Sequence, residues 1–152
     1  SVETFDLEPN SRPWGIAVGE TKVWVTHQAA NKIISYSRAT GSVVDIFDYQ
    51  TSLVSGRRPW GIAVDNTWVW VANNGDISGP QSDTVIKLFR SNGGFEKEIN
   101  VDPHMASLSP RSSLLGILSD GVNVWIVSNE VTPGSAVSSS GMGGSLIKYN
   151  IA

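Results

Sequence analysis

The sequence reads RPWGIAVGETKVWVTH from Arg12 to His27 and RPWGIAVDNTWVWVAN from Arg58 to Asn73. A looser third copy, SLLGILSDGVNVWIVS, runs from Ser113 to Ser128. In every copy the residue before the first glycine stands ten positions before a tryptophan, in the pairs Trp14 and Trp24, Trp60 and Trp70, and Leu115 and Trp125. A pattern that recurs with one internal spacing indicates a repeat architecture.

Each copy continues into further segments of alternating or continuous apolar residues, which are typical of strands. A third segment is present in all copies: NKIISYS from Asn31, DTVIKLF from Asp83 and GSLIKYN from Gly144. A fourth follows in the first two copies only: SVVDIFDY from Ser42 and GFEKEINVD from Gly94. Its counterpart stands at the start of the sequence, where VETFDL from Val2 matches VDIFDY from Val44 position by position. The strand order is therefore one fourth strand, two complete four-strand units, and three strands of another unit.

Four short antiparallel strands per repeat of about 45 to 50 residues are typical of a propeller blade. The composition agrees, because six Trp, fifteen Gly and seven Pro suit short strands separated by turns. We predict an all-β protein, a single β-propeller domain over residues 1–152 with three blades. The expected parts are a closing outer strand at 1–8, blades at 12–49 and 58–102, and a third blade without its outer strand at 113–152.

A propeller ring contains four to eight blades as a rule, so three blades do not close alone. We expect two chains to join head to tail as a homodimer with six blades, each chain giving its first strand to the last blade of the other. The alternative is a fragment of a longer single-chain propeller. Within the ring, Trp24, Trp70 and Trp125 are predicted to pack between blades, since aromatic side chains bury a large apolar area.

Charge and cysteine content exclude several classes of function. Eleven Lys and Arg against fourteen Asp and Glu give a net charge of −3, so nucleic acid is not an expected partner. With no Cys, the chain has no thiolate metal site and no cysteine nucleophile. No apolar run approaches the roughly 20 residues that span a membrane, so we expect a soluble protein without membrane contact. The compartment stays open, with a secreted or periplasmic location as candidates.

Loop lengths predict which face of the propeller binds a ligand. The turns that join strands 1 to 2 and 3 to 4 are short, whereas the longer segments all join strands 2 to 3 or successive blades. Trp14 and Trp60 stand beside the long-loop face at the start of the innermost strands, each two positions after an arginine, Arg12 or Arg58. Aromatic faces beside arginine and amide groups suit sugar rings and other flat ligands. Leu115 interrupts this pattern in the third blade.

Polar residues at the ends of the second strands complete the predicted ligand site: His27, Asn73, Asn74 and Asn129. Such residues also cap strands and turns, so the sequence leaves both roles open. Only two histidines are present, and an alternative is that His27, His104 and Glu130 meet as a metal or acid–base site, with Asp76 as a further candidate. No metal-binding motif supports this alternative, so we predict no catalytic residues, no metal site and no cofactor.

The segments PWGIAVDNTWVWVANN and PWGIAVGETKVWVTHQAANKIISYS resemble the repeats of NHL-type and virginiamycin B lyase-like propellers. In the lyase family, the resemblance implies a catalytic histidine between the Pro and Gly of late repeats, together with a glutamate and a divalent metal. The matching positions here are Trp14, Trp60 and Leu115, which do not accept a proton or bind magnesium. The likeness therefore predicts blade architecture and not the lyase reaction.

We predict a non-catalytic, lectin-like binding module whose ligand is a glycan, a peptide or another small molecule. Some lectins, which the chain resembles in architecture only, build six-bladed rings from several short chains. Two alternatives remain. One is a metal-assisted lyase or hydrolase of the virginiamycin B lyase-like type, and the other is a structural or assembly fragment of a larger propeller protein.

Overall fold

The computed structural model describes residues 2–52, 54, 57–75, 83–101, 113–131 and 142–151. All regular elements in these ranges are β-strands, which confirms the all-β class. No helix in the described ranges is long and apolar enough to cross a membrane.

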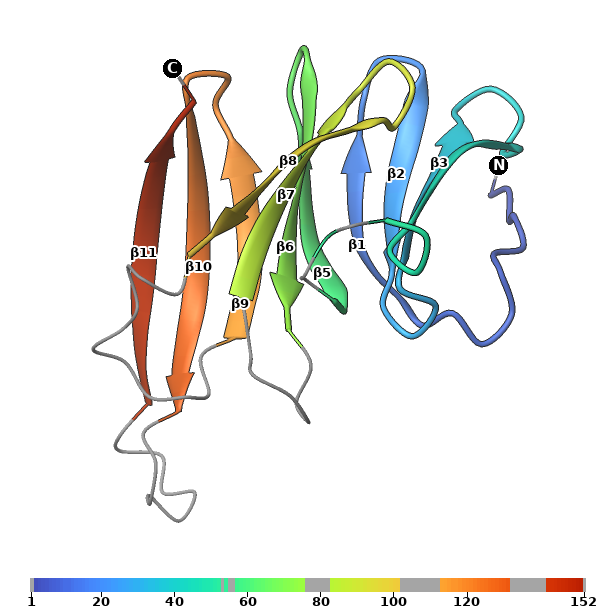
Figure 1. Cartoon of the computed structure of the whole chain (residues 1–152). Coiled ribbons are helices and arrows are strands. Elements are labelled where there is room, and N and C mark those ends of the chain that lie inside the picture. The colour runs from blue at the N-terminus through green and yellow to red at the C-terminus, as the bar shows by residue number, and fades with distance from the viewer. Residues whose placement is uncertain are drawn as a thin grey trace.

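The strands form three antiparallel sheets (Figure 1). The first sheet has the order β1-β2-β3-β4, with strands Pro13–Val18, Lys22–His27, Lys32–Ser37 and Val43–Asp48. The second has the order β5-β6-β7-β8, with strands Pro59–Val64, Trp68–Asn74, Asp83–Phe89 and Phe95–Asn100. The third has three strands among the described residues, β9 (Ser113–Ser119), β10 (Asn123–Val131) and β11 (Met142–Asn150), in the order β11-β10-β9.

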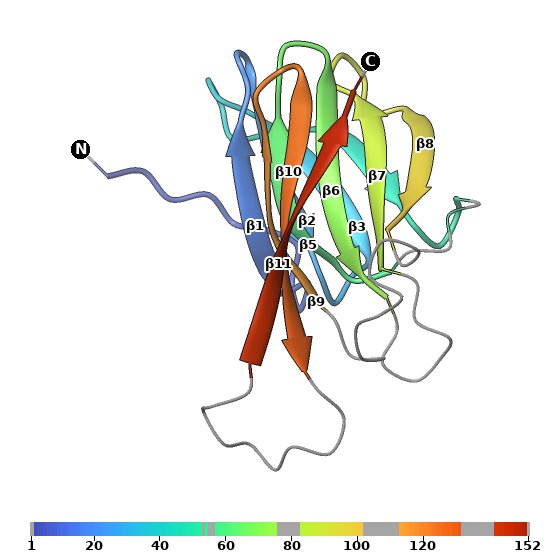
Figure 2. The ribbon, with the colours of Figure 1, turned by 90° about the vertical axis from the view of Figure 1, so that its left-hand side faces the viewer.

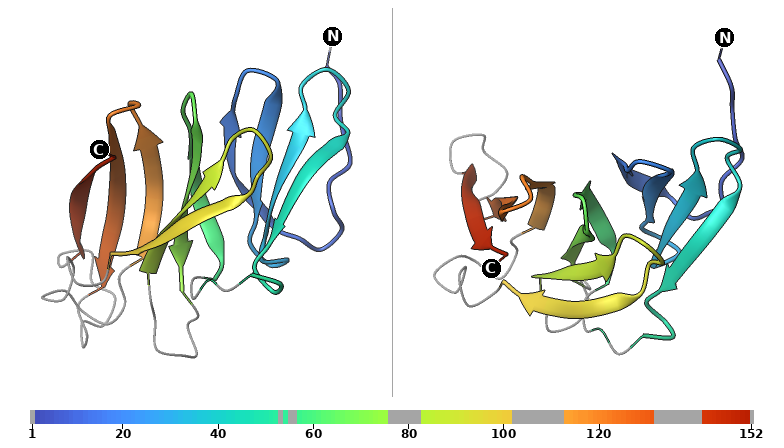
Figure 3. Two further views of the ribbon diagram at one scale, coloured as in Figure 1. Left: turned by 45° about the horizontal axis from the view of Figure 1, so that its top comes forward. Right: turned by 90° about the horizontal axis from the view of Figure 1, so that it is seen from above.

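The three sheets stand side by side like the blades of a fan, and we call them blades 1, 2 and 3 in chain order. Seen from above, the blades follow an arc, with β1, β5 and β9 on its inner side and β4 and β8 on its outer side (Figure 3). The N-terminus lies beside blade 1 and the C-terminus lies in blade 3, on opposite sides of the fan. Figure 2 looks onto the outer face of blade 3, the face that is turned away from blade 2.

Short hairpins join the strands at one end of the fan (Figure 1). In the β3–β4 and β7–β8 hairpins, Gly41 and Gly93 have φ of 68° and 69°, a left-handed conformation that glycine adopts without steric cost. The strand ends that the longer segments join lie together at the opposite end. The predicted division into a short-turn face and a long-loop face is therefore present.

Apolar side chains fill the spaces between neighbouring blades. Between blades 1 and 2, Trp24 and Ile33 pack against Val69, Val71 and other residues of blade 2. Between blades 2 and 3, the core comprises Trp70, Val85, Leu114, Val124 and Ile126, with further residues around them. Trp24 and Trp70 are fully buried, as expected for residues between blades.

Trp125 occupies the same repeat position but is only partly buried, because it lies on the outer face of blade 3. Its indole Nε1 donates a hydrogen bond to Asp120 Oδ2 at 3.0 Å, and the Lys148 ammonium lies 5.1 Å from the ring centroid. The prediction that Trp125 packs between two blades requires a further blade next to blade 3.

Residues 2–8 form no strand in the single chain. The segment runs along the outer side of blade 1 (Figure 1), where Leu7 packs against a small core of Val25, Ile34 and Tyr36. An ion pair of 2.7 Å between Glu8 and Lys32 fixes its end. The sequence predicted that this segment pairs as a strand with the last blade of a second chain. This pairing stays a prediction.

Candidate ligand site at the long-loop face

Trp14 and Trp60 lie close together at the starts of β1 and β5. Their ring centroids are 4.4 Å apart and the rings meet edge to face, an arrangement that aromatic pairs prefer. Trp14 is nevertheless 59% exposed, and Trp60 is partly buried. The pair is thus an apolar surface that water reaches and not part of the core.

Each of the two tryptophans lies within a register irregularity, Trp14 in β1 and Trp60 in β5. The pairing of β1 with β2 shifts between Pro13 and Ile16, and that of β5 with β6 shifts between Pro59 and Ile62. An irregularity of this kind redirects the side chains within it, and it is common next to functional sites.

Thr26 holds the two tryptophan-bearing strands side by side. Its buried hydroxyl accepts a hydrogen bond of 2.8 Å from the Gly15 N–H and donates one of 2.8 Å to the Trp60 carbonyl. There is no room for a side chain at Gly15, because a Cβ there would lie 2.3 Å from the Trp60 carbonyl oxygen. The position of the aromatic pair is therefore set by backbone contact between the blades.

Three arginines line a hollow of about 340 Å³ at the same end of the fan, together with two amide side chains and one alanine: Arg12, Gln28, Ala29, Asn31, Arg57 and Arg58. We call this the arginine hollow. The described residues that line it include no carboxylate. The hollow therefore gathers positive charge on a chain whose net charge is −3.

Two of these arginines have an unusual backbone conformation. Arg12 has φ of 48° and Arg58 has φ of 57°, in the left-handed region that residues with a Cβ rarely adopt. Their carbonyl groups accept hydrogen bonds from Gln28 N and Asn74 N, and the Arg58 N–H donates to Asn31 Oδ1 at 2.8 Å. Conformations of this kind persist where the surrounding structure holds them, and they cluster at functional sites.

His27 is fully buried, and both of its ring nitrogens have partners. Nδ1 lies 2.7 Å from Ser11 Oγ, and Nε2 lies 3.0 Å from the Tyr36 hydroxyl. Burial lowers the pKa of the imidazole, and the nearby Lys32 adds to this, although Glu8 opposes it. His27 therefore ties strand ends together in its neutral form and is not accessible to a ligand.

The two asparagines at the end of β6 differ from each other. Asn73 is fully buried and is bonded to the Tyr49 hydroxyl at 2.6 Å and to Thr84 Oγ1 at 3.1 Å, so its role is structural. Asn74 is 6% exposed, and among the described residues neither its side-chain nitrogen nor its oxygen has a hydrogen-bond partner. Like His27, the Asn74 amide is therefore buried in this structure and is not exposed to a ligand.

The remaining predicted residues cannot be placed in full. His104 and Asp76 lie outside the described residues, as do the side chains of Asn129 and Glu130, whose backbones belong to β10. Within the described part of the chain, no three His, Asp or Glu residues gather as metal ligands would. Of the alternative site of His27, His104 and Glu130, only the side chain of His27 is described. It is buried, and both of its ring nitrogens already have hydrogen-bond partners.

The repeated motif did not point to Arg57 or Asn31 as members of the arginine hollow, whereas Gln28 was expected beside His27 at the end of the second strand. Arg57 is adjacent to Arg58, and Gln28 and Asn31 lie in the loop that follows β2. Arg57 belongs to the segment between blades and is not part of the repeated motif, so repeat comparison does not reveal it.

No protein-family model matches the sequence, and the comparison with curated proteins found no significant match. Three solved structures illustrate the structural likeness. A streptogramin B lyase has a TM-score of 0.57 and 22% identity, over 95% of this chain and 42% of its own. A luciferin-regenerating enzyme has a TM-score of 0.58 and 14% identity, over 91% and 44%. Glutaminyl cyclase from Myxococcus xanthus has a TM-score of 0.52 and 11% identity, over 92% and 56%.

The chain thus spans between about two fifths and somewhat more than half of the length of these proteins. The neighbours are β-propeller proteins, and at this level of identity the likeness concerns the fold alone. Together with the three antiparallel sheets side by side, it shows that the chain has a propeller-repeat fold.

Proposed function

We propose that this chain is a non-catalytic, ligand-binding propeller module whose site combines the Trp14–Trp60 pair with the arginine hollow. The observation that supports it best is the solvent-exposed aromatic pair, with ring centroids 4.4 Å apart, at the inner strands of two adjacent blades. A sugar ring stacks on such a surface through its apolar face. We therefore take a glycan as the ligand, and a peptide as the alternative that the experiment must separate.

The charge of the hollow narrows the class of glycan. The guanidinium groups of Arg12 and Arg58 and two amide side chains offer hydrogen-bond donors, and guanidinium groups bind carboxylate and phosphate in bidentate geometry. We therefore expect a ligand that carries an acidic group, such as a uronic acid or a sulfated sugar.

The assembled form is part of this proposal. Two copies would close a six-bladed ring, so that the aromatic pairs and arginine hollows of both copies surround one opening. The two sites would be equivalent under a two-fold axis, which allows one extended glycan to bind at both.

A glycan array with neutral and acidic sugars, accompanied by acidic peptides, tests the proposal. We expect acidic glycans to bind and neutral ones to bind more weakly. Trp14→Leu and Trp60→Leu, which introduce the residue type of the third repeat, should each weaken binding about tenfold, which corresponds to about 1.4 kcal/mol. Arg12→Asn and Arg58→Asn should weaken it by a similar factor and reduce the preference for acidic sugars, since asparagine tolerates the left-handed backbone.

Arg38→Asn is the matched control, because Arg38 is an exposed arginine at the short-turn face, where it donates to the carbonyls of Gly19 and Glu20. This variant should bind as the wild type does. Binding that survives the Trp14 and Trp60 substitutions would refute the site. A response to acidic peptides alone would refute the glycan as ligand.

A further inference from the structure

The outer faces of blades 1 and 3, which are turned away from blade 2, expose apolar side chains, whereas the faces between blades bury them. On the outer face of blade 1 the exposed fractions are 67% for Ile16, 61% for Val18, 47% for Val44 and 58% for Ile46. On blade 3 they are 40% for Leu115, 64% for Leu118, 47% for Val127 and 66% for Leu146. Contiguous apolar faces of this kind mark sites of association.

Strand registers show that several of these positions are buried where they recur between blades. Ser35, Lys87 and Lys148 are paired with the equivalent tryptophans of the three blades. By this alignment, exposed Leu146 corresponds to Ile33 and Val85, which are 0% and 1% exposed. In the same way Ile16 corresponds to Ile62, which is 8% exposed. Each outer face is therefore one half of the type of junction that the chain forms twice internally.

The repeated glycines indicate how closely a further blade would approach. A Cβ at Gly15 would lie 2.3 Å from the carbonyl oxygen of Trp60, and a Cβ at Gly61 would lie 2.8 Å from that of Leu115. Gly116 is the equivalent residue of blade 3, and a Cβ there would meet nothing within 4 Å. Gly15 and Gly61 allow the first strand of the next blade to approach closely. Gly116 would serve the same purpose only if the first strand of a further blade lay against blade 3.

The N-terminal segment already lies where the outer strand of a preceding blade belongs. Tyr49, which directly follows β4, shares the inner core with three residues of blade 2: Val71, Ile86 and Leu88. The equivalent residues of blade 1 are Val25, Ile34 and Tyr36, and Leu7 packs against the cluster that they form. Leu7 is also the residue that the sequence match aligns with Tyr49. The segment therefore has the position of a fourth strand, but in the single chain it has no sheet to join.

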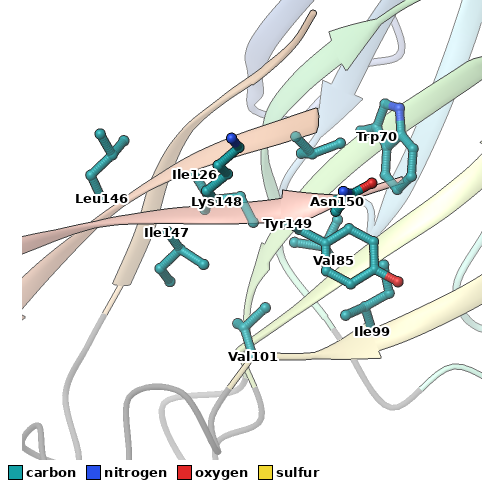
Figure 4. Close-up of a pocket in the computed structure, with 11 residues that line it drawn as sticks. Trp70, Val85, Ile99, Val101, Ile126, Leu146, Ile147, Lys148, Tyr149 and Asn150 are labelled. Atoms are coloured by element: carbon teal, nitrogen blue, oxygen red, sulfur yellow. The ribbon is translucent and has the colours of Figure 1, made fainter. Parts of the chain in front are cut away.

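Blade 3 offers that sheet. A cavity of about 500 Å³ lies between blades 2 and 3 beside β11, and its lining includes Ile99, Val101, Ile147 and Tyr149 (Figure 4). Leu146 and Lys148 reach it from the other face of β11. The described residues place no strand beyond β11, so this edge of the sheet and the cavity next to it lie open.

We propose that a second copy of this chain is the occupant: its blade 1 docks on the outer face of blade 3, and its residues 2–7 pair with β11 as the missing fourth strand. This inference specifies the interface of the homodimer proposed above and does not depend on which ligand the module binds. One chain carries both complementary faces, so two copies form two equal junctions. The result is a closed ring of six blades, within the usual range.

At each junction the carbonyl of the second copy's Trp14 would lie against Gly116, as the Trp60 carbonyl lies against Gly15. The second copy's Ile16 and Val18 would cover Leu118 and Trp125, and its Val2 and Thr4 would face the cavity beside β11. Closure also removes the unpaired strand edge, which otherwise invites aggregation.

Sedimentation equilibrium of the 152-residue chain tests the inference. The expected mass is about 33 kDa, twice the 16.3 kDa of one chain. Gly116→Ala should give a folded monomer, because the added methyl group has free space in one copy and clashes in the ring. Leu118→Glu should do the same through an unpaired charge at the junction. Val122→Glu is the matched control, since Val122 is 62% exposed at a turn whose equivalents are also exposed, and it should remain dimeric.

A wild-type mass of 16.3 kDa at micromolar concentration would overturn the inference, and so would a mass above that of a dimer. A dimer that Gly116→Ala leaves intact would place the interface elsewhere and refute the proposal as well. Failure here is distinguishable from failure of the ligand site. The arginine hollow lies within one copy, so its variants are expected to change binding without changing the mass.

Discussion

The junction between blades 1 and 2 and the outer face of blade 3 use the same repeat positions in different surroundings. At the junction, Trp24 is fully buried and Gly15 touches the next backbone. On the outer face, Trp125 is only partly buried and the space above Gly116 is empty. At these two positions the residue type is the same and only the neighbour differs. We therefore expect every repeat to carry the residues of an interface, including blade 3, for which a second copy is the neighbour that we propose.

The largest difference is expected between two equivalent tryptophans. Trp70→Ala should lower the free energy of unfolding by about 3–5 kcal/mol, because it leaves a cavity between blades 2 and 3. Trp125→Ala, measured in the monomeric Gly116→Ala background, should cost less than half as much. Urea denaturation followed by tryptophan fluorescence measures both. Equal losses would contradict the difference between the inner junction and the outer face.

Gly15 and Gly116 allow the same comparison to be made by adding a single methyl group at each position. Gly15→Ala should destabilise the fold by about 1–3 kcal/mol, since the new Cβ collides with the Trp60 carbonyl. Gly116→Ala should change the stability of the dilute monomer by no more than about 0.5 kcal/mol. Thermal unfolding of both variants below the concentration of assembly provides the measurement. A large loss of monomer stability in Gly116→Ala would show that this glycine has an intramolecular role.

Two aspartates extend the comparison to polar contacts. Asp65 Oδ2 accepts 2.7 Å hydrogen bonds from Trp70 Nε1 and Ser119 Oγ, and so links blade 2 to blade 3. Asp120 has the equivalent bond to Trp125 Nε1 at 3.0 Å, but lies exposed in a turn. Asp65→Asn should therefore cost about 1–3 kcal/mol at neutral pH, and Asp120→Asn clearly less. Denaturation of the two variants under identical conditions decides between them.

The pH dependence of this contribution has a definite sign. Burial raises the pKa of Asp65, but hydrogen bonds from Thr67, Trp70, Ser119 and Trp68 outweigh it, so the pKa lies below its usual value. The stabilisation is therefore present above the unfolded-state pKa of about 4 and is lost as the pH falls through the folded-state pKa. In Asp65→Asn the unfolding free energy should depend less on pH in this acidic range. An unchanged acid dependence would contradict the role of the carboxylate.

The smallest effect concerns His27. Its pKa is lowered by burial, so the unfolded chain takes up the proton first, and stability should fall as the pH drops below about 6.5. His27→Gln keeps a hydrogen-bonding side chain and should flatten the stability profile between pH 7 and pH 5. Thermal melts across this range measure it. A His27→Gln profile as steep as that of the wild type would place the titrating group elsewhere.

The sequence was most informative about the architecture. The alternation in KVWVT and WVWVA and the spacing between glycine and tryptophan predicted the strands, and the all-β propeller fold is confirmed. Loop lengths also predicted correctly which end has the short hairpins. These features follow from local backbone preferences and from a pattern that occurs three times, so one sequence was enough to find them.

The candidate site was less predictable. The sequence identified Trp14, Trp60, Arg12 and Arg58 as neighbours of the long-loop face, but it did not reveal that His27 and Asn73 would be bonded inside the sheets. Their partners, Tyr36 and Tyr49, stand on other strands, and only the packed structure brings them together. The Asp65–Trp70 link was missed although its spacing of five recurs in Asp120–Trp125.

Amide hydrogen exchange at β11 tests the central claim most directly. Ile151 N–H donates to Val122, so the alternation of the strand turns the N–H groups of Leu146 and Lys148 toward the outer edge. If residues 2–7 of a second copy pair there, these two amides will exchange slowly at high protein concentration, as we also expect of Val85 and Lys87, which pair with β8. In Gly116→Ala they should exchange rapidly. Rapid exchange in the wild type at high concentration would contradict the claim that each blade carries the interface for its neighbour.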